Sequence, residues 1–232
     1  MTKLEFLELY EKENSEDWIE NSTGGLIHIK AKVDNPKNIT GGIVWSKASV
    51  LGNAKISGNA KVCGNSCVED DAQVSGDASL GSNAQVSGNA KISDNAQVYG
   101  YAKVYGDAKI SDNALVDDHA CIGDFAEVSG NARVSSHVMV YDYACVNGNA
   151  RVYSYAKISG NAKVYGYTHV GDDAKVYGNA KISGNAEVCG KSRVGGNVEV
   201  SGDVVLNINA YISGNAWISS DAKVSGDVSL LI

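Results

Sequence analysis

The feature of this sequence that most constrains its fold is an apolar residue that recurs every six positions. From Val44 to Leu230, every sixth residue is Val, Ile or Leu, and no insertion interrupts the register. A helix would space its apolar residues by three and four, and a half-buried strand would alternate them every two. Because a period of six fits neither element, the repeat itself must be the unit of structure.

Each six-residue unit also carries a small residue and a turn signal. With the apolar residue as position one, position five is usually Ala, position three is commonly Gly, and position four is commonly Asn or Asp. Val and Ile suit a buried, pleated strand. Gly and Asn tolerate the positive φ of a tight corner. The unit is therefore predicted to be a short strand followed by a corner.

Three such units are predicted to close one triangular coil, so that residues 18 apart occupy the same place on successive coils. Stacked coils pair their backbones at about 4.8 Å and bury position one in a continuous narrow core. About ten coils follow, giving a prism roughly 50 Å long. The 26 glycines and single proline agree with corners that are all built in one way.

The [Leu/Ile/Val]-x-x-x-[small]-x rhythm resembles that of the hexapeptide-repeat proteins, over roughly four fifths of the chain. The fold that this resemblance implies is all-β, a left-handed parallel β-helix. Its handedness comes from the resemblance alone, because ordinary crossover rules favour the right hand. The regular "SGNAKVYG" style is also similar to repeats in proteins encoded by phages and prophages.

The segment before the repeat is predicted to cap the rod. Residues 1–43 would form a helical cap and a first irregular coil, and residues 44–232 the β-helix. "KLEFLELYEKENSEDWIEN" places Leu4, Leu7, Trp18 and Ile19 among acidic residues, which predicts one or two amphipathic helices. "GLIHIKAKV" then predicts a strand that enters the first coil. Such a cover is expected because the end of a solenoid exposes its core.

Outward-facing columns of aromatic residues break the monotony of the repeat near the middle of the chain. At position four, aromatic side chains replace Asn or Asp in several coils, at an expected cost on the order of 1 kcal/mol if that position has a positive φ. Others occupy position two. We define the Tyr/His belt as these residues: Tyr99, Tyr101, Tyr105, His119, Phe125, His137, Tyr141, Tyr143, Tyr153, Tyr155, Tyr167 and Tyr177.

Two interpretations of the Tyr/His belt remain open. Stacked aromatic ladders can simply add cross-strand packing. Alternatively, large rigid side chains with polar tips form a recognition surface for a partner protein or a second copy of the chain. We favour a non-catalytic binding or scaffold protein that needs no cofactor or metal. The phage-like repeats would make an inhibitor of a host enzyme or defence complex one form of that function.

The resemblance also implies a catalytic alternative. Many hexapeptide-repeat proteins are acyltransferases, in which a histidine is the general base and an acyl-CoA donor binds between subunits of a trimer. His119 and His137 are the candidate bases. The uninterrupted repeat lacks the extruded loop that usually shapes the acceptor site of these enzymes. The zinc carbonic anhydrases of the same fold would need a third histidine, and none is predicted near these two.

Charge and composition narrow the remaining function classes. A formal charge of −7 and a pI near 5.1 argue against nucleic-acid binding, which requires clustered Lys and Arg. The five cysteines have no C-x-x-C spacing, so they predict reduced thiols rather than disulfides or a zinc site. No apolar run approaches the ~20 residues of a membrane span. The N-terminus does not have the order of a signal peptide, so we expect a cytoplasmic protein.

The C-terminal sequence predicts how copies of the chain associate. "VSLLI" places Leu230, Leu231 and Ile232 in a last coil that has no cap, so its core and strand edges would meet water. We predict a two-fold, tail-to-tail dimer through these residues. Deleting them or replacing Leu230 with Asp is expected to halve the mass in solution, measured by light scattering. An unchanged mass would contradict this mode of association.

Overall fold

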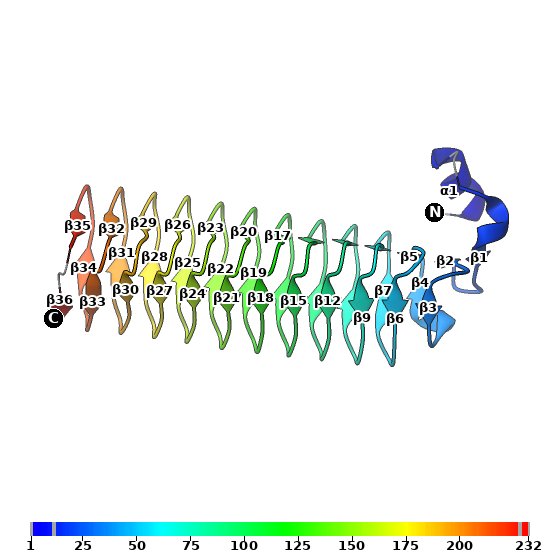
Figure 1. Ribbon diagram of the computed structural model, residues 1–232, viewed down its shortest axis with the longest axis horizontal. Helices are drawn as coiled ribbons and strands as arrows, with labels where there is room; N and C mark the ends of the chain where they lie inside the picture. The colour runs from blue at the N-terminus through cyan, green and yellow to red at the C-terminus, as the bar shows by residue number, and fades with distance from the viewer. Residues whose placement is uncertain (1, 11–12, 227–228, 232) are drawn as a thin grey trace.

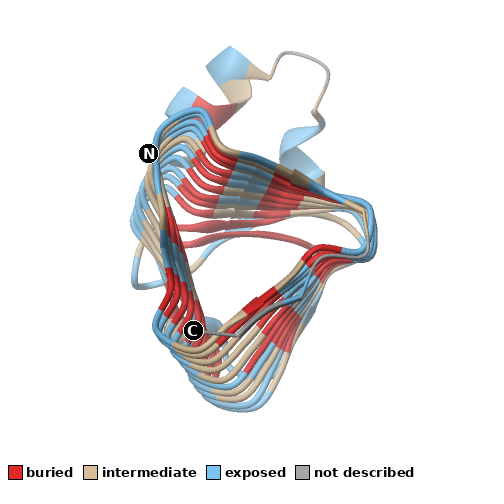
Figure 2. Cartoon of the chain, turned by 90° about the vertical axis from the view of Figure 1, so that its left-hand side faces the viewer, coloured by how far each residue is buried: buried red, intermediate tan, exposed pale blue. Residues whose placement is uncertain are grey.

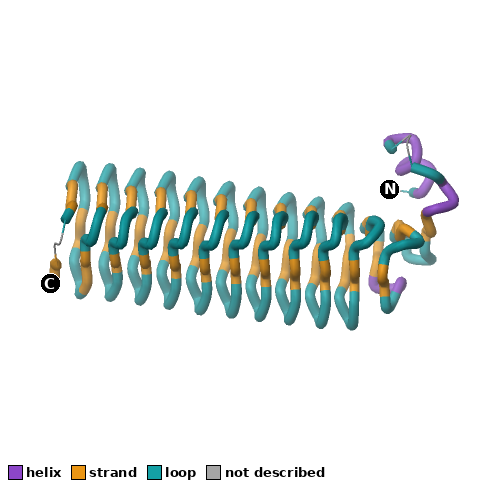
Figure 3. Tube along the Cα trace, in the orientation of Figure 1, coloured by secondary structure: helices purple, strands orange, loops and turns teal. Residues whose placement is uncertain are grey.

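The computed structural model of the protein is a straight rod of stacked coils (Figure 1). The structure describes residues 2–10, 13–226 and 229–231. Viewed along the rod, the coils superpose as a triangle with buried residues inside (Figure 2). Short strands and turns recur at the same places in every coil (Figure 3). The predicted fold class, an all-β parallel β-helix with a short N-terminal helical segment, is confirmed.

Three sheets form the sides of the triangle, and the described residues contribute 13, 12 and 11 strands to them. The 13-stranded sheet contains β1 (Trp18–Glu20), β2 (Leu26–His28), β5 (Ile43–Val44), β8 (Lys61–Val62), β11 (Ser79–Leu80), β14 (Gln97–Val98), β17 (Leu115–Val116), β20 (Arg133–Val134), β23 (Arg151–Val152), β26 (His169–Val170), β29 (Glu187–Val188), β32 (Val205–Asn207) and β35 (Lys223–Ser225). The 12-stranded sheet contains β3 (Lys32–Val33), β6 (Ser49–Val50), β9 (Cys67–Val68), β12 (Gln85–Val86), β15 (Lys103–Val104), β18 (Cys121–Ile122), β21 (Met139–Val140), β24 (Lys157–Ile158), β27 (Lys175–Val176), β30 (Arg193–Val194), β33 (Tyr211–Ser213) and β36 (Ser229–Leu231). The 11-stranded sheet contains β4 (Ile39–Thr40), β7 (Lys55–Ser57), β10 (Gln73–Val74), β13 (Lys91–Ile92), β16 (Lys109–Ile110), β19 (Glu127–Val128), β22 (Cys145–Val146), β25 (Lys163–Val164), β28 (Lys181–Ile182), β31 (Glu199–Val200) and β34 (Trp217–Ile218).

Strands on neighbouring coils pair in parallel with a constant register. Cys121 pairs with Met139, and Ile122 with Val140, so each partner lies 18 residues further along the chain. The first coil is shorter by one residue, because Leu26 pairs with Ile43. Residues before Val44 therefore already wind into the rod as an irregular coil.

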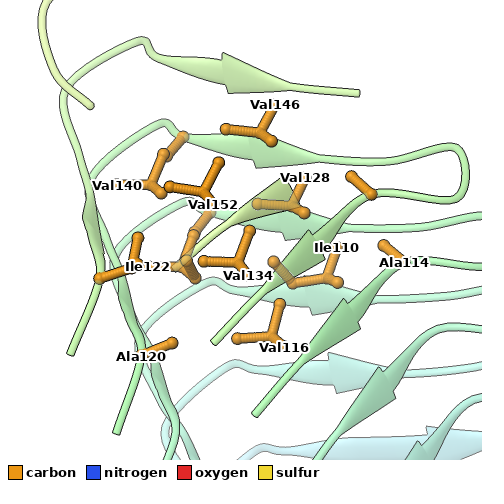
Figure 4. Close-up of a cluster of buried hydrophobic side chains, with 14 of the residues drawn as sticks. Ile110, Ala114, Val116, Ala120, Ile122, Val128, Val134, Val140, Val146 and Val152 are labelled. Atoms are coloured by element: carbon orange, nitrogen blue, oxygen red, sulfur yellow. The ribbon is translucent and has the colours of Figure 1, made fainter. Parts of the chain in front are cut away.

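The core is a single file of side chains from positions one and five. Val and Ile at position one and Ala at position five are fully buried through most of the rod. Figure 4 shows Ile110, Val128 and Val146 pointing into the interior from successive coils, with Val116, Val134 and Val152 from another side. Each buried Val or Ile contributes roughly 1.5–3 kcal/mol relative to exposure. Two-residue strands gain their stability from this stacking rather than from their own length.

The left-handed backbone of each corner lies at position three rather than position four. Gly at position three has φ near +68°, as at Gly58 and Gly88, and Asp or Ser takes its place with φ near +60°, as at Asp142. Lys47, at position four of an early corner, is an exception with φ of +66°. The expected backbone cost of an aromatic residue at position four therefore does not apply to the Tyr/His belt.

Polar ladders explain the Asn and Asp of positions three and four. Asn113 donates from Nδ2 to Asn131 Oδ1 at 3.1 Å, and Asn131 donates onward to Asn149 at 3.2 Å. Asp at position three accepts a backbone N–H from the next coil, as Asp142 does from Gly160 at 2.8 Å. Both devices satisfy polar groups at the turns, where the backbone makes fewer ladder bonds.

The N-terminal segment covers the first coils with one short α-helix. Helix α1 (Lys3–Leu9) begins with a capping box between Thr2 and Glu5. Phe6 of α1 is buried against Trp18, with ring centroids 4.5 Å apart. No helix in the described residues is long and apolar enough to cross a membrane.

The amphipathic pattern predicted for this segment is only partly correct. Trp18 and Ile19 lie in strand β1, which pairs antiparallel with β2, and not in a second α-helix. A single 3-10 turn, η1 (Ser15–Asp17), precedes β1, and a second, η2 (Pro36–Asn38), precedes β4. The side chain of Leu4 is 70% exposed, because Phe6 and Trp18 fill the contact with the rod.

The apolar C-terminal residues predicted to mediate a dimer can be followed only as backbone. Leu230 and Leu231 belong to β36, which pairs with β33. Their side chains, and the whole of Ile232, lie outside the described residues. The tail-to-tail dimer stays a prediction.

One buried hydroxyl in the core has no hydrogen-bond partner among the described residues. Thr168 is fully buried at position five, and its Oγ1 is unpaired. Ser192, also at position five, instead donates from Oγ to the carbonyl of Cys189 at 2.7 Å. Position five accepts Val elsewhere, as at Val138 and Val198.

Replacing Thr168 with Val is therefore expected to raise the free energy of unfolding by about 1 kcal/mol, because it removes an unsatisfied buried group without changing volume. The matched control, Ser192→Ala, deletes a satisfied hydroxyl and is expected to lower it by about 1 kcal/mol. Chemical denaturation measures both changes. A destabilised Thr168→Val variant would show that the hydroxyl is satisfied in solution.

Candidate protein-binding surface

Most of the Tyr/His belt lies along the two edges of the 12-stranded sheet. Tyr101 and the residues below it in its column occupy the corner between the 13- and 12-stranded sheets, since they follow β14 and precede β15 in the repeat. Phe125 and Tyr143 occupy the next corner, between the 12- and 11-stranded sheets. We call the outward surface of the 12-stranded sheet between these corners the belt face.

The predicted aromatic ladders are present. Tyr101 and His119 stack at 5.0 Å between ring centroids, His119 and His137 at 4.9 Å, and His137 and Tyr155 at 4.9 Å. Phe125 and Tyr143 stack at 4.8 Å and are within 4° of parallel. The inter-coil spacing of a parallel sheet imposes these separations. At each corner an aromatic ladder stands where an Asn ladder would otherwise run.

Two coils between the ladders present no charged side chain at positions two, four and six. One coil places His119, Cys121, Gly123 and Phe125 outward, and the next places His137, Met139, Tyr141 and Tyr143. The exposed fractions of the larger apolar side chains on and around these coils are Phe125 49%, Met139 36%, Tyr143 62%, Tyr101 56% and Tyr155 58%. Exposed apolar groups of this size, gathered on one face, are typical of interaction sites.

The nearest carboxylates lie at the edge of this apolar centre. Asp124 accepts the backbone N–H of Asp142 at 3.1 Å, and Asp142 accepts that of Gly160 at 2.8 Å. Both side chains are thereby turned along the corner toward the next coil. The centre of the belt face itself is aromatic and apolar.

The tyrosines at position two have a different role from those at position four. The Tyr105 ring lies over Gly123, where a Cβ would come within 2.2 Å of the ring, and Tyr177 lies over Gly195 in the same way. Tyr99 covers Gly81, and Tyr153 covers Gly171. Each ring fills the space above a glycine at position two of an adjacent coil, so these four tyrosines are packing elements.

Hydrogen bonds and pKa shifts agree with that packing role. Tyr99 donates from its hydroxyl to Ser79 Oγ at 2.8 Å. Burial, together with the hydrogen bond to Tyr211, raises the pKa of Tyr177 to about 12. Burial also raises the pKa of Tyr153 above its usual range. The pairing of Tyr with a Gly 18 residues away was the sequence signal that could have distinguished these residues from the exposed ladders.

Two further belt residues differ in position. Tyr141 is half-buried near the centre of the belt face. Tyr167 is 64% exposed but occupies the third corner, between the 11- and 13-stranded sheets, because it follows β25 and precedes β26. The belt predicted from the sequence is therefore one surface around the 12-stranded sheet plus an isolated tyrosine elsewhere.

His119 and His137 are exposed members of a ring stack. Their imidazoles face each other and the flanking tyrosines at about 5 Å, and the concavities that the structure defines are lined by other residues. A general base needs a bound acceptor held at hydrogen-bond distance. In the described part of the chain, no three His, Cys, Asp or Glu side chains come together as metal ligands.

The cysteine thiols are poor candidates for nucleophiles. All five are free in the structure. Burial raises the pKa of Cys63, Cys67, Cys145 and Cys189 above the ordinary thiol value. A thiol with a raised pKa has little thiolate at neutral pH.

A basic concavity adjoins the aromatic ladder, and sequence reasoning missed it. It has a volume of about 390 Å³ and is lined by Tyr155, Lys157, Asp173, Lys175, Lys191 and Arg193. On the 11-stranded sheet the lysine column is neutralised by ion pairs, Lys109 with Glu127 and Lys181 with Glu199. In the described residues, none of the four cations of the concavity forms such a pair. The signal was a column with Lys or Arg at 157, 175 and 193.

Comparisons with known proteins support the repeat architecture. A family model described as "YdcK Beta solenoid repeat" matches residues 84–100. No curated protein matches the chain. A UDP-N-acetylglucosamine acyltransferase from Campylobacter jejuni is 15% identical, with a TM-score of 0.41 over 70% of this chain and 67% of that one.

The Arabidopsis UDP-N-acetylglucosamine acyltransferase gives a similar result. It is 15% identical, with a TM-score of 0.42 over 82% of this chain and 66% of that one. Likenesses this distant concern the solenoid alone. They assign no activity to this chain, so its function has to be argued from the belt face.

Proposed function

We propose that this chain is a non-catalytic binding or scaffold protein whose working surface is the belt face. The observation that carries the proposal is the pair of exposed aromatic ladders enclosing two coils with no outward charge. A solenoid side that only had to be soluble would carry Lys, Gln, Ser and Asn there, as the rest of this rod does. Exposed apolar area on a rigid support is what a docking surface requires.

The rigidity of the surface favours binding. Each belt residue stands on a strand or corner held by inter-coil backbone bonds, such as Lys103 N to Ala120 O at 2.9 Å and Tyr105 N to Ile122 O at 3.0 Å. Stacking within the ladders also restricts the side-chain rotamers before any partner arrives. Little conformational entropy is then lost on association, so a modest contact area suffices.

The similarity of the repeats to phage and prophage proteins supports one form of this function. A host protein bound along the belt face would have its own surface covered by a stiff rod, which would make this chain an inhibitor of that protein. This form of the proposal requires a partner with an exposed apolar surface and acidic groups opposite Lys175 and Arg193.

Replacing Tyr143 and Tyr155 together with Ala is expected to leave the thermal midpoint within a few degrees of the wild type. Both rings stand outside the core and lie over no glycine. Protein partners retained by immobilised wild-type chain should fall at least about tenfold, because exposed aromatic anchors typically contribute 2 kcal/mol or more to binding. Quantitative affinity purification from the native host measures the change.

The matched control is Tyr165→Ala, which removes a tyrosine that is 37% exposed on the 11-stranded sheet, away from the belt face. This variant is expected to keep every partner of the wild type. Equal retention by all three proteins would remove the belt face as the binding surface.

The catalytic alternative makes a different prediction. An acyltransferase must bind its acyl-CoA donor, and a ligand that binds only the folded state raises the thermal midpoint. For the wild-type protein we expect no shift with millimolar acetyl-CoA or a longer acyl-CoA. A dose-dependent rise that is lost in His119→Ala or His137→Ala would favour the enzyme over the binding protein.

A further inference from the structure

Charge is distributed unevenly along the belt face. On the three coils before the apolar centre, at β9, β12 and β15, the outward charged residues are Glu69, Asp70, Asp71, Lys103 and Asp107, with a net charge of −3. On the three coils after it, at β24, β27 and β30, they are Lys157, Asp173, Lys175, Lys191 and Arg193, with a net charge of +3. The belt face is acidic on one side of its aromatic centre and basic on the other.

Neither charged region is neutralised within the chain. Asp71 accepts from Asn53 at 3.1 Å and Asp107 from Asn89 at 3.1 Å, and both donors are neutral amides. Asp70 accepts the backbone N–H of Gly88 at 2.9 Å. The two ion pairs found in the described residues both lie on the 11-stranded sheet. Stacked like charges repel, so each region is stabilised by a partner of opposite sign.

The two regions are equally far from the centre. The centre consists of β18 and β21, and the three acidic coils precede it by the same number of coils as the three basic coils follow it. A two-fold axis that passes between β18 and β21, parallel to the strands, would bring each coil of the acidic region onto a coil of the basic region of another copy. An isologous contact requires this kind of self-complementarity.

We propose that two copies of this chain pair through their belt faces, antiparallel, about a two-fold axis between β18 and β21. This inference rests on the proposed function of the belt face as a protein-docking surface and names its occupant. β9 of one copy then lies across from β30 of its partner, β12 from β27, and β15 from β24. The aromatic centres meet each other, and the acidic and basic regions meet twice.

The contact has the dimensions of a weak but specific interface. Eight coils at about 4.8 Å span roughly 35 Å, and a strand with its flanking corner residues is roughly 15 Å wide at 3.3 Å per residue. Both surfaces together bury on the order of 1,000 Å², at the lower limit for a specific complex. We therefore expect dissociation constants in the micromolar range and a strong dependence on salt.

Some like charges also approach one another in this pairing. Lys103 lies near Lys157 of the second copy, and Asp124 near Asp142 at the edge. Lys103 and Lys157 are long, exposed side chains that can turn toward solvent. Asp124 and Asp142 are held along the corner by backbone N–H groups. These contacts weaken the pair without changing its symmetry.

Sedimentation equilibrium of the full chain measures the association. At about 100 μM protein and about 50 mM salt the wild type is expected to approach the mass of a dimer, and at about 500 mM salt it should return toward the monomer. Arg193→Glu and Glu69→Arg should each weaken the dimer at least about tenfold. The double variant Glu69→Arg with Arg193→Glu restores opposite charges across the two-fold axis, so it should regain most of the affinity.

Lys163→Glu, on the 11-stranded sheet, is the matched charge reversal and should leave the dimer unchanged. Circular dichroism checks that each variant is folded. The proposal is overturned by a monomer under all conditions, or by a double variant as weak as either single variant. It is equally overturned by a dimer that ignores Arg193→Glu but dissociates on Leu230→Asp, since that dimer would be tail-to-tail. A monomer that still requires Tyr143 and Tyr155 to capture another protein would overturn this inference and leave the proposed function standing.

Discussion

The parallel backbone pairing of each coil with the next is the interaction on which the rest of this structure depends. It sets a spacing of about 4.8 Å between equivalent residues and keeps residues 18 apart in register from β5 onward. Because the core is one side chain wide, a change of register would move position one to the outside of the rod. The uninterrupted repeat and the straight rod are thus two descriptions of one constraint.

The same register turns single substitutions into surfaces. An aromatic residue at position four of one coil stacks on the residue at position four of the next, so His119 and His137 are neighbours although they are 18 residues apart. At position two, the outcome depends on the neighbour: a tyrosine beside a glycine lies down over it, as Tyr105 does over Gly123. Exposed recognition residues and half-buried packing residues therefore occur among the same residue type on one face.

Electrostatics separates the sides of the prism by function. The 11-stranded sheet pairs its lysines with glutamates in the same column, which suits a solvated surface. The belt face instead leaves its cations and carboxylates without ionic partners in the described residues, on opposite sides of an aromatic centre. Unpaired charge and exposed apolar area coincide on this sheet, and this coincidence supports a role in association over one in catalysis.

The repeat alone determined the β-helix, its 18-residue columns and the stacking of Tyr101 with His119, because an unbroken period leaves the chain one way to bury its apolar residues. It did not determine that position three carries the positive φ, that Trp18 and Ile19 lie in a strand, or that Tyr99, Tyr105, Tyr153 and Tyr177 pack over glycines. Those outcomes depend on space and hydrogen bonds between coils. The handedness of the winding rests on the resemblance to hexapeptide-repeat proteins. Only the tertiary structure placed the basic concavity beside Tyr155, because side chains from different columns meet only once the coils have closed.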